Sequence, residues 1–180
     1  FCREKDKMAN IVLIGMPGCG KSTVGVLLAK ALQMDFVDTD IVLQQQQGKK
    51  LQEIIDQVGN DAFLKMEENC VRGLECDQTV VATGGSVVYG KEAMRRLHEN
   101  GLVVYIRLPY EEIERRLSNL ATRGVTLKKG QTLRNLYDER IPLYEAEADY
   151  TFEPEEGDVQ ETVLDLAQHL SARMEADNGR

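Results

Sequence analysis

Residues 15–22 of this 180-residue chain read GMPGCGKS, which matches the pattern G-x-x-x-x-G-K-[ST] at every fixed position. The apolar run Asn10–Ile14 precedes this stretch, and Lys21–Gln33 follows it with apolar residues at helical spacing. Glycines let such a loop fold tightly, so that several backbone N–H groups and the positive end of the next helix converge on one phosphate. A chance glycine-rich turn is the alternative, but the strand before the loop and the helix after it favour a phosphate-binding P-loop.

The residues of this loop predict what it binds. Lys21 supplies a mobile charge that can follow the γ-phosphate of a nucleoside triphosphate, and the Ser22 hydroxyl can bind Mg²⁺. We therefore expect ATP and Mg²⁺ as cofactors. Cys19 is expected to be a small loop residue, with a redox-sensitive thiol as the alternative. The expected nucleotide-binding residues of the loop are Gly15, Gly18, Cys19, Gly20, Lys21, Ser22 and Thr23.

Outside the P-loop, apolar strands alternate with helical stretches to the end of the chain. This alternation predicts an α/β fold, a three-layer sandwich with a central parallel five-stranded sheet and helices on both faces. Gly101 is expected to end a helix in the C′ position, and Pro142 is expected to kink or split another. The predicted strands are Asn10–Ile14, Phe36–Val37, Thr79–Ala82, Leu102–Leu108 and Tyr150–Phe152. The predicted helices are Lys21–Gln33, Ile41–Gln47, Leu51–Val58, Asp61–Cys76, Lys91–Asn100, one that opens at Pro109, Thr132–Glu147 and Val159–Ala176.

Composition limits the classes of protein. No repeat or long linker divides the chain, so we expect a single domain over residues 9–180, after a disordered leader at residues 1–8. The formal net charge of −8 argues against a nucleic-acid-binding surface, and no apolar run is long enough to predict a membrane span. The four cysteines have no CxxC spacing, which favours reduced thiols in a cytoplasmic protein. We expect a monomer.

A second polar stretch, Asp38-Thr39-Asp40, comes directly after the predicted strand Phe36–Val37. Ligands of open parallel sheets bind beyond the carboxyl ends of the strands. Two carboxylates at this edge could serve Mg²⁺ and a substrate hydroxyl, because Mg²⁺ prefers oxygen ligands and a kinase must orient the attacking hydroxyl. The alternative is a solvated turn in which Asp40 caps the next helix.

The motifs GMPGCGKST, DTD, ATGG, TRG and ERIPLY follow one another along nearly the whole chain from Asn10. In this order and at these spacings they resemble the shikimate kinase family, among the P-loop proteins similar to nucleoside monophosphate kinases. The resemblance implies a P-loop kinase fold and a transferase that moves the γ-phosphate of ATP to a hydroxyl of shikimate, a small hydroxylated acid of aromatic amino acid biosynthesis.

The resemblance also implies catalytic and metal-binding residues. Lys21 and Ser22 would hold ATP and Mg²⁺, with Asp38 near the metal. Asp40 would bind the hydroxyls of the acceptor and orient the one that attacks. Arg123 would lie in a lid at about 118–130 that closes over the transferred phosphate, opposite a substrate lobe at about 43–73. The implied catalytic residues are Lys21, Asp40 and Arg123.

Further residues would contact the two ligands. Gly84 and Gly85 would bring the backbone close to the acceptor, Arg140 would pair with its carboxylate, and Arg116 would lie against the adenine. Arginine suits these roles because its fork of N–H donors fits carboxylates and phosphates. The alternatives are surface solubility for Arg116 and Arg123, and a solvated helix face for Arg140.

Three positions depart from the family pattern. Leu64 stands where the family has an arginine on the acceptor carboxylate, Ser86 replaces the third glycine after a strand, and Gly124 replaces a proline of the lid. Two of the three fall in the acceptor pocket, so a retained phosphotransferase with an altered acceptor is the alternative to the predicted phosphorylation of shikimate. Leu64 would suit a less anionic or more apolar molecule, and Ser86 could bond a new polar group.

Other interpretations remain open at this point. Shikimate could still bind, with Lys65 or another base in place of the missing arginine. A related P-loop kinase could act on another hydroxy acid, a polyol or an amino alcohol. A non-catalytic nucleotide-binding homologue is a third reading, against which Asp40 and Arg140 argue. A nucleic-acid-processing ATPase is the most remote, given the charge and size of the chain.

Overall fold

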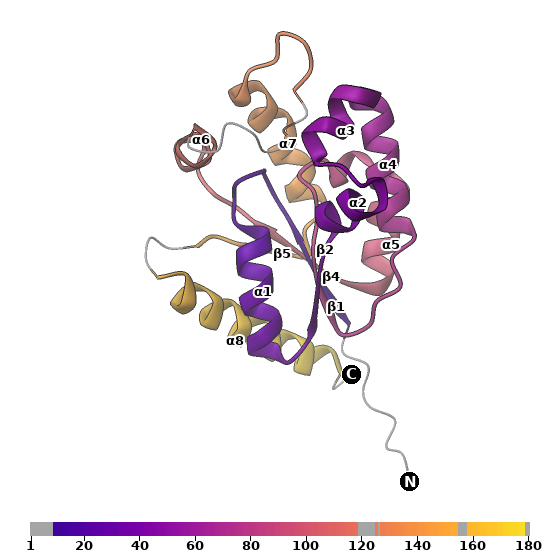
Figure 1. Ribbon diagram of the computed structural model, residues 1–180. Helices are drawn as coiled ribbons and strands as arrows, with labels where there is room; N and C mark the ends of the chain where they lie inside the picture. The colour runs from indigo at the N-terminus through magenta and orange to yellow at the C-terminus, as the bar shows by residue number, and fades with distance from the viewer. Residues whose placement is uncertain (1–8, 119–124, 126, 155–157, 179–180) are drawn as a thin grey trace.

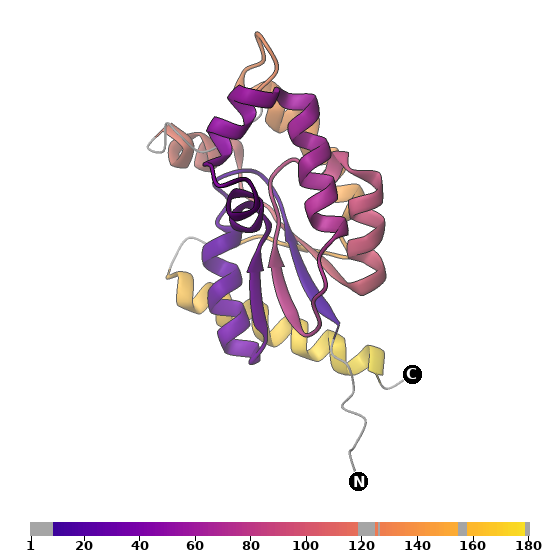
Figure 2. The ribbon, with the colours of Figure 1, turned by 45° about the vertical axis from the view of Figure 1, so that its right-hand side comes forward.

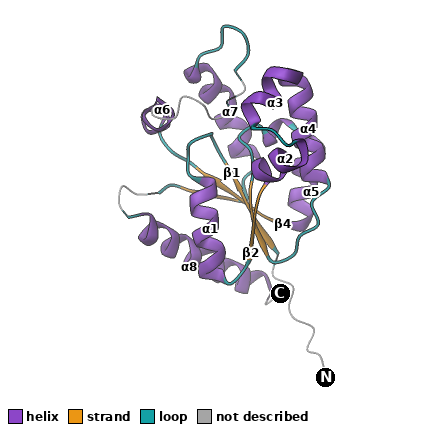
Figure 3. Ribbon diagram, in the orientation of Figure 1, coloured by secondary structure: helices purple, strands orange, loops and turns teal. Residues whose placement is uncertain are grey.

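A central sheet of five parallel strands organises the protein (Figure 1). The computed structural model describes residues 9–118, 125, 127–154 and 158–178, with side chains as far as residue 173. The strand order is β2-β3-β1-β4-β5, and every pairing is parallel (Figure 3). The strands are β1 (Asn10–Ile14), β2 (Asp35–Asp38), β3 (Thr79–Ala82), β4 (Gly101–Ile106) and β5 (Tyr150–Phe152).

Helices cover both faces of this sheet. Helices α1 and α8 pack together on one side, and α4 and α5 pack together on the other (Figure 1). Every residue of β1 and β3 is buried, as central strands covered on both faces require. The predicted three-layer α/β sandwich is thus confirmed. The helices are α1 (Lys21–Leu32), α2 (Thr39–Gln47), α3 (Leu51–Val58), α4 (Asn60–Arg72), α5 (Lys91–Asn100), α6 (Tyr110–Ser118), α7 (Leu133–Glu147) and α8 (Val159–Asn178), with the 3₁₀ turn η1 (Val87–Tyr89).

Two expectations about helix ends were wrong. The helix predicted to reach Cys76 ends at Arg72, where the N–H of Gly73 donates to the Asn69 carbonyl at 3.1 Å and closes the last turn. Gly101 does not adopt a left-handed cap but is the first residue of β4, with a φ of −169°. A Cβ at Gly101 would lie 2.6 Å from the carbonyl oxygen of Asn10, so the glycine serves close strand pairing instead.

Pro142 lies inside α7 without splitting it. A proline removes one helical N–H, and the carbonyl four residues earlier loses its donor. Pro142 and Asp138, which carries that carbonyl, are both exposed, so water can take the place of the lost donor. Within the described residues, no helix combines the length and the apolar character needed to cross a membrane.

The carboxyl ends of three strands meet at one edge of the sheet. Ala82 of β3 pairs with Leu13 of β1 on one side and with Asp38 of β2 on the other. The loops that follow these strands therefore open side by side. Helices α2, α3 and α4, which make up the predicted substrate lobe at 43–73, lie beyond this same edge (Figure 2).

Candidate active site

The P-loop turns through three glycines with positive φ, namely Gly15 (145°), Gly18 (80°) and Gly20 (99°). Residues with a Cβ rarely adopt such angles, which explains the glycines of the motif. Lys21 begins α1 and is only 8 % exposed. Its ammonium group donates to the carbonyl oxygens of Gly15 at 2.8 Å and Met16 at 2.9 Å, so the charge is held against the loop itself.

Ser22 and Asp38 are joined directly. The Ser22 hydroxyl donates to Asp38 Oδ2 at 2.5 Å, while Asp38 Oδ1 accepts the backbone N–H groups of Asp40 at 2.9 Å and Ile41 at 3.3 Å. Asp38 is therefore the N-cap of α2, and the alternative in which Asp40 caps this helix is wrong. The first turns of α1 and α2 are held together through this one carboxylate.

The donor set of this pair fits Mg²⁺. A hydroxyl and a carboxylate are the hard oxygen ligands that the ion prefers. Among the described residues, no group of three or more His, Cys, Asp or Glu side chains could hold a metal ion alone. Mg²⁺ commonly takes one or two protein ligands and completes its shell with water and nucleotide phosphates.

Asp40 lies against the loop that follows β3. A Cβ built on Gly84 would stand 2.8 Å from Asp40 Oδ1 and 1.9 Å from Glu67 Oε1. The Gly84 N–H donates to the Thr39 hydroxyl at 3.1 Å, which fixes the loop to the start of α2. A side chain at residue 84 would have to displace both of these carboxylates.

Glu67 is a residue of this site that the sequence analysis missed. It lies on α4, is 3 % exposed, and accepts the Ser86 hydroxyl on Oε2 at 2.5 Å. The other buried residues of α4 are Phe63, Cys70 and Val71. These spacings place Glu67 on the apolar stripe of the helix, and a carboxylate at a core position is the signal that could have revealed it.

Burial shifts the titration of both carboxyl groups. It raises the pKa of Glu67 to about 7; the Ser86 hydrogen bond opposes this rise, Asp40 adds to it, and the charges of Arg140 and Lys21 oppose it. Burial likewise raises the pKa of Asp40 to about 6, where Asp38 adds to the rise and Lys21 opposes it. Two neighbouring carboxyl groups with raised pKa values are typical of functional sites.

Arg140 lies on the other side of the same loop. It is 1 % exposed, its guanidinium carbon is 5.3 Å from the centre of the Tyr89 ring, and Nη1 lies 3.1 Å from a Cβ built on Gly85. The Tyr144 hydroxyl donates to the Gly85 carbonyl at 2.5 Å and holds this turn in place. The solvated helix face considered for Arg140 is therefore wrong.

The remaining predicted residues lie at the nucleotide end or outside the described residues. Arg116 on α6 reaches the P-loop, where Nη1 donates to the Gly18 carbonyl at 3.4 Å and Nε pairs with Glu112 at 2.6 Å. Thr23 is exposed in the first turn of α1, and Cys19 is buried within the loop. Arg123 and Gly124, predicted for the lid, lie outside the described residues.

The comparisons with known proteins agree with this geometry. A family model described as shikimate kinase matches residues 17–171. The chain belongs to the shikimate kinase family. It is 39 % identical over 172 residues to a shikimate kinase of Paracidovorax citrulli, covering 92 % of each chain, and 36 % identical over 167 residues to that of Vibrio parahaemolyticus, covering 91 % of this chain and 97 % of the other.

Solved shikimate kinases share the fold. The Acinetobacter baumannii enzyme in complex with shikimate superposes with a TM-score of 0.85 at 30 % identity, over 92 % of this chain and 94 % of that one. The Aquifex aeolicus enzyme gives a TM-score of 0.75 at 29 % identity, over 91 % and 97 % of the two chains. This member of the shikimate kinase family is accordingly an ATP-dependent phosphotransferase of the P-loop kinase fold.

Both acceptor-side departures from the shikimate kinase pattern adjoin Glu67. Leu64 precedes Glu67 by three residues on α4 and is half-buried. Ser86 is 5 % exposed, has a φ of −93° that any residue adopts, and gives its hydroxyl hydrogen to Glu67. Ser86 was expected to bond a new polar group, and in the structure its partner is Glu67 of the protein itself.

Proposed function

We propose that this chain transfers the γ-phosphate of ATP, bound with Mg²⁺, to a hydroxyl of shikimate. The position of Asp40 carries the proposal. Its carboxylate borders Gly84 at the carboxyl edge of the sheet, two residues from the Ser22–Asp38 pair. The relative in complex with shikimate supports the acceptor class.

At the nucleotide end, Lys21 would exchange the carbonyl oxygens of Gly15 and Met16 for the phosphates. Ser22 and Asp38 would hold Mg²⁺, which supplies positive charge against the phosphate oxygens. Arg116 at the P-loop would lie against the adenine, and Arg123 would stabilise the charge of the transferred phosphoryl group when the lid closes.

At the acceptor end, Asp40 would accept the hydrogen of the attacking hydroxyl and aim its oxygen at the γ-phosphate. Because its pKa is about 6, the carboxylate is ionised at pH 7 to 8 and ready to accept. Gly84 and Gly85 let the ring approach the backbone closely. Arg140, beside Gly85, would pair with the carboxylate of the acceptor.

Substitution of Asp40 tests the proposal. Asp40→Asn keeps the shape of the side chain but cannot take a proton, and we expect kcat with every acceptor to fall by about 10²- to 10⁴-fold, with ATP affinity unchanged. Asp61→Asn, an exposed change in the first turn of α4, is the matched control. Turnover by Asp40→Asn at the wild-type rate would reject the role of Asp40. If wild-type protein that binds ATP phosphorylates neither shikimate nor any related polyol, the function itself is rejected.

A further inference from the structure

A cavity lies near the amino ends of the strands, away from the P-loop. Its volume is about 430 Å³, and it opens between β1, β3 and the carboxyl-terminal ends of α4 and α5. Asn10, the first residue of β1, lines it, whereas the P-loop and the loop with Gly84 follow the carboxyl ends of their strands. The volume falls within the range of small-molecule sites. Of the described residues that line it, none has a part in the phosphotransfer above, so the cavity is a separate candidate site.

One side of this cavity is apolar. Val12 of β1 and Val81 of β3 pair in register, line the cavity and are each 1 % exposed. Leu97 of α5 is 6 % exposed, and Leu74, after the end of α4, is half-buried. Apolar ligand surface placed against these side chains leaves water, which favours binding. The cavity therefore suits a ligand with a large apolar group.

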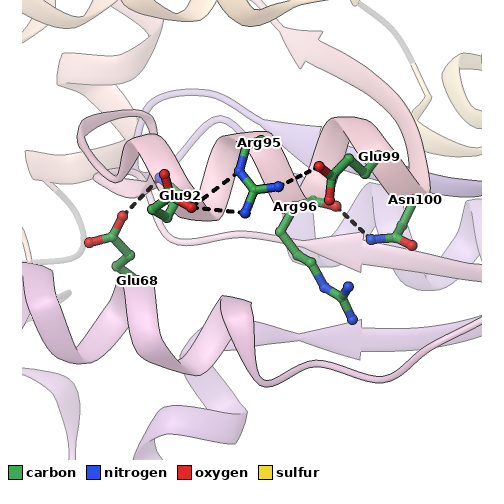
Figure 4. A network of polar contacts seen from close by, with 6 residues as sticks. All are labelled: Glu68, Glu92, Arg95, Arg96, Glu99 and Asn100. Carbon is green, nitrogen blue, oxygen red and sulfur yellow. Dashed lines mark hydrogen bonds and ion pairs between the residues drawn. The ribbon is translucent and has the colours of Figure 1, made fainter.

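Arg96 brings a positive charge to the cavity. Its neighbour Arg95 is bound by two carboxylates of the same helix, Glu92 and Glu99. The Arg96 side chain instead extends from α5 away from both of them (Figure 4). Within the part of the chain that the structure describes, no group accepts a hydrogen bond from the Arg96 guanidinium. The residue is half-buried, so an anion bound to it would be partly shielded from water, where charge-assisted bonds are strong.

Negative charges border the same cavity on the segment between α4 and β3. Glu75 and Asp77 both line it, on either side of Cys76. The Asn10 side chain donates to the Cys76 carbonyl at 2.9 Å, which ties this segment to β1. Burial raises the pKa of the Cys76 thiol, Asp77 adds to the rise and Arg96 opposes it, so charges of both signs lie close to one point of the cavity wall.

The charges and the apolar side together define the ligand. A purely anionic ligand would meet the two carboxylates, and a purely cationic one would leave Arg96 without a partner. We propose that this cavity binds a free amino acid with a large apolar side chain, its carboxylate on Arg96 and its ammonium group on the side of Glu75 and Asp77. Arginine fits the carboxylate because its fork of donors pairs with both oxygens. The site goes beyond the proposed function and does not depend on it.

Three compounds that share one apolar group test the proposal by isothermal titration calorimetry. L-Phenylalanine carries both charges, 3-phenylpropanoate lacks the ammonium group, and 2-phenylethylamine lacks the carboxylate. We expect L-phenylalanine to bind the wild-type protein with a Kd of about 1 mM or lower, and about tenfold or more tighter than either of the others, because each of them loses a charge-assisted bond. Absence of binding by L-phenylalanine, or binding no tighter than that of 3-phenylpropanoate, would overturn the inference.

Arg96→Gln assigns the carboxylate of the ligand to its partner. We expect this variant to weaken L-phenylalanine and 3-phenylpropanoate by about tenfold each and to spare 2-phenylethylamine. Arg95→Gln is the matched control, because it makes the same change one residue earlier on α5, where the side chain is held by Glu92 and Glu99 (Figure 4). Equal losses in the two variants, or an unchanged Kd in Arg96→Gln, would contradict the assignment and with it the proposal.

The double variant Glu75→Gln/Asp77→Asn assigns the ammonium group. L-Phenylalanine should bind it about tenfold more weakly, whereas 3-phenylpropanoate should bind at least as well as to the wild type, because the opposing charges are gone. This difference in direction serves as the internal control, since a misfolded cavity would weaken both compounds. Thermal unfolding checks that each variant is folded. A loss of equal size for both compounds would count against the proposal.

The thiol of Cys76 reports where the ligand lies. Alkylation by iodoacetamide, followed residue by residue with mass spectrometry, should be slowed at Cys76 by saturating L-phenylalanine and unchanged at Cys19 of the P-loop. L-Phenylalanine should still bind when ATP and shikimate are both saturating. Unprotected Cys76, or displacement of L-phenylalanine by shikimate, would place the compound elsewhere and overturn the inference. Each of these readouts is a binding measurement, so its failure leaves the proposed phosphotransfer untouched.

Discussion

The nucleotide end and the acceptor end of this site are built in different ways. The nucleotide end is centred on one loop and one helix start, where glycine backbone angles and two adjacent residues, Lys21 and Ser22, shape the cradle. The acceptor end collects Asp40, Glu67 and Arg140 from three different helices around a single loop. Backbone geometry fixes the first end, whereas buried side-chain charges define the second.

The largest effect is expected at the nucleotide end. Lys21→Met removes the charge that reaches the phosphates, so kcat/KM should fall by about 10²- to 10³-fold for every acceptor alike. Steady-state assays with two acceptors test this, with Lys30→Met on the exposed face of α1 as control. A change in the ratio between acceptors would show that the two ends are not separable.

A methyl group at Gly84 should damage the acceptor end alone. The added Cβ displaces the carboxylates of Glu67 and Asp40, and a misplacement of about 1 Å costs about 10²-fold in kcat/KM for the acceptor. ATP affinity, measured by calorimetry, should stay within about twofold. Gly73→Ala, at a helix end with ordinary contacts, is the control. Equal losses in ATP binding and acceptor turnover would contradict the separation.

The burial of Glu67 should also make the free energy of unfolding depend on pH. Its pKa of about 7 in the folded protein exceeds the value of 4.5 expected when unfolded, so the folded form binds more protons and loses stability as the pH rises from about 4.5 to 7. The groups that act on Glu67 are Ser86, Asp40, Arg140 and Lys21. Relative to the wild type, Glu67→Gln should gain up to about 3 kcal/mol between these pH values.

Urea unfolding at pH 5 and pH 8 measures this gain. A stability difference between Glu67→Gln and the wild type that is the same at both pH values would mean that Glu67 titrates as an ordinary carboxyl group.

The smallest effect concerns Arg116. Loss of a cation that lies against an aromatic base weakens binding by about two- to fivefold, so Arg116→Ala should raise KM for ATP by that factor and leave KM for the acceptor unchanged. Arg115→Ala is the control, because Arg115 binds the same Glu112 carboxylate. An unchanged KM for ATP would remove Arg116 from the nucleotide end.

Most of the fold could be predicted from local patterns. β1, β3, β5, α3 and α5 have the bounds that apolar runs, helical spacing and glycine signals indicated. The errors fell where tertiary contacts decide. Residue 101 is a glycine because any Cβ there would lie too close to the carbonyl oxygen of Asn10 in the neighbouring strand. No pattern within the predicted helix indicates that contact.

The residues of the site likewise divide into those that local motifs predict and those that depend on tertiary contacts. Lys21, Ser22 and Asp38 lie in motifs whose spacing reflects a single loop and its neighbour, and the structure brings them together. Glu67 has no motif, because its role depends on the meeting of α4 with the loop after β3, far away in the sequence. The one signal for Glu67 in the sequence was a charged residue on an otherwise apolar helix stripe. Because Glu67 was not recognised, Ser86 was expected to bond a ligand instead of this residue.

Asp38 gives the two substrates a way to influence each other. One oxygen holds the Ser22 hydroxyl and the other holds the first turn of α2, where Asp40 lies. A metal ion that draws Ser22 away from this carboxylate alters the support of that turn, and an acceptor that draws Asp40 acts back along the same path. Thermodynamic linkage then requires reciprocity: if nucleotide tightens the acceptor by some factor, the acceptor tightens the nucleotide by the same factor. One aspartate thereby connects the binding of the two substrates within a single chain.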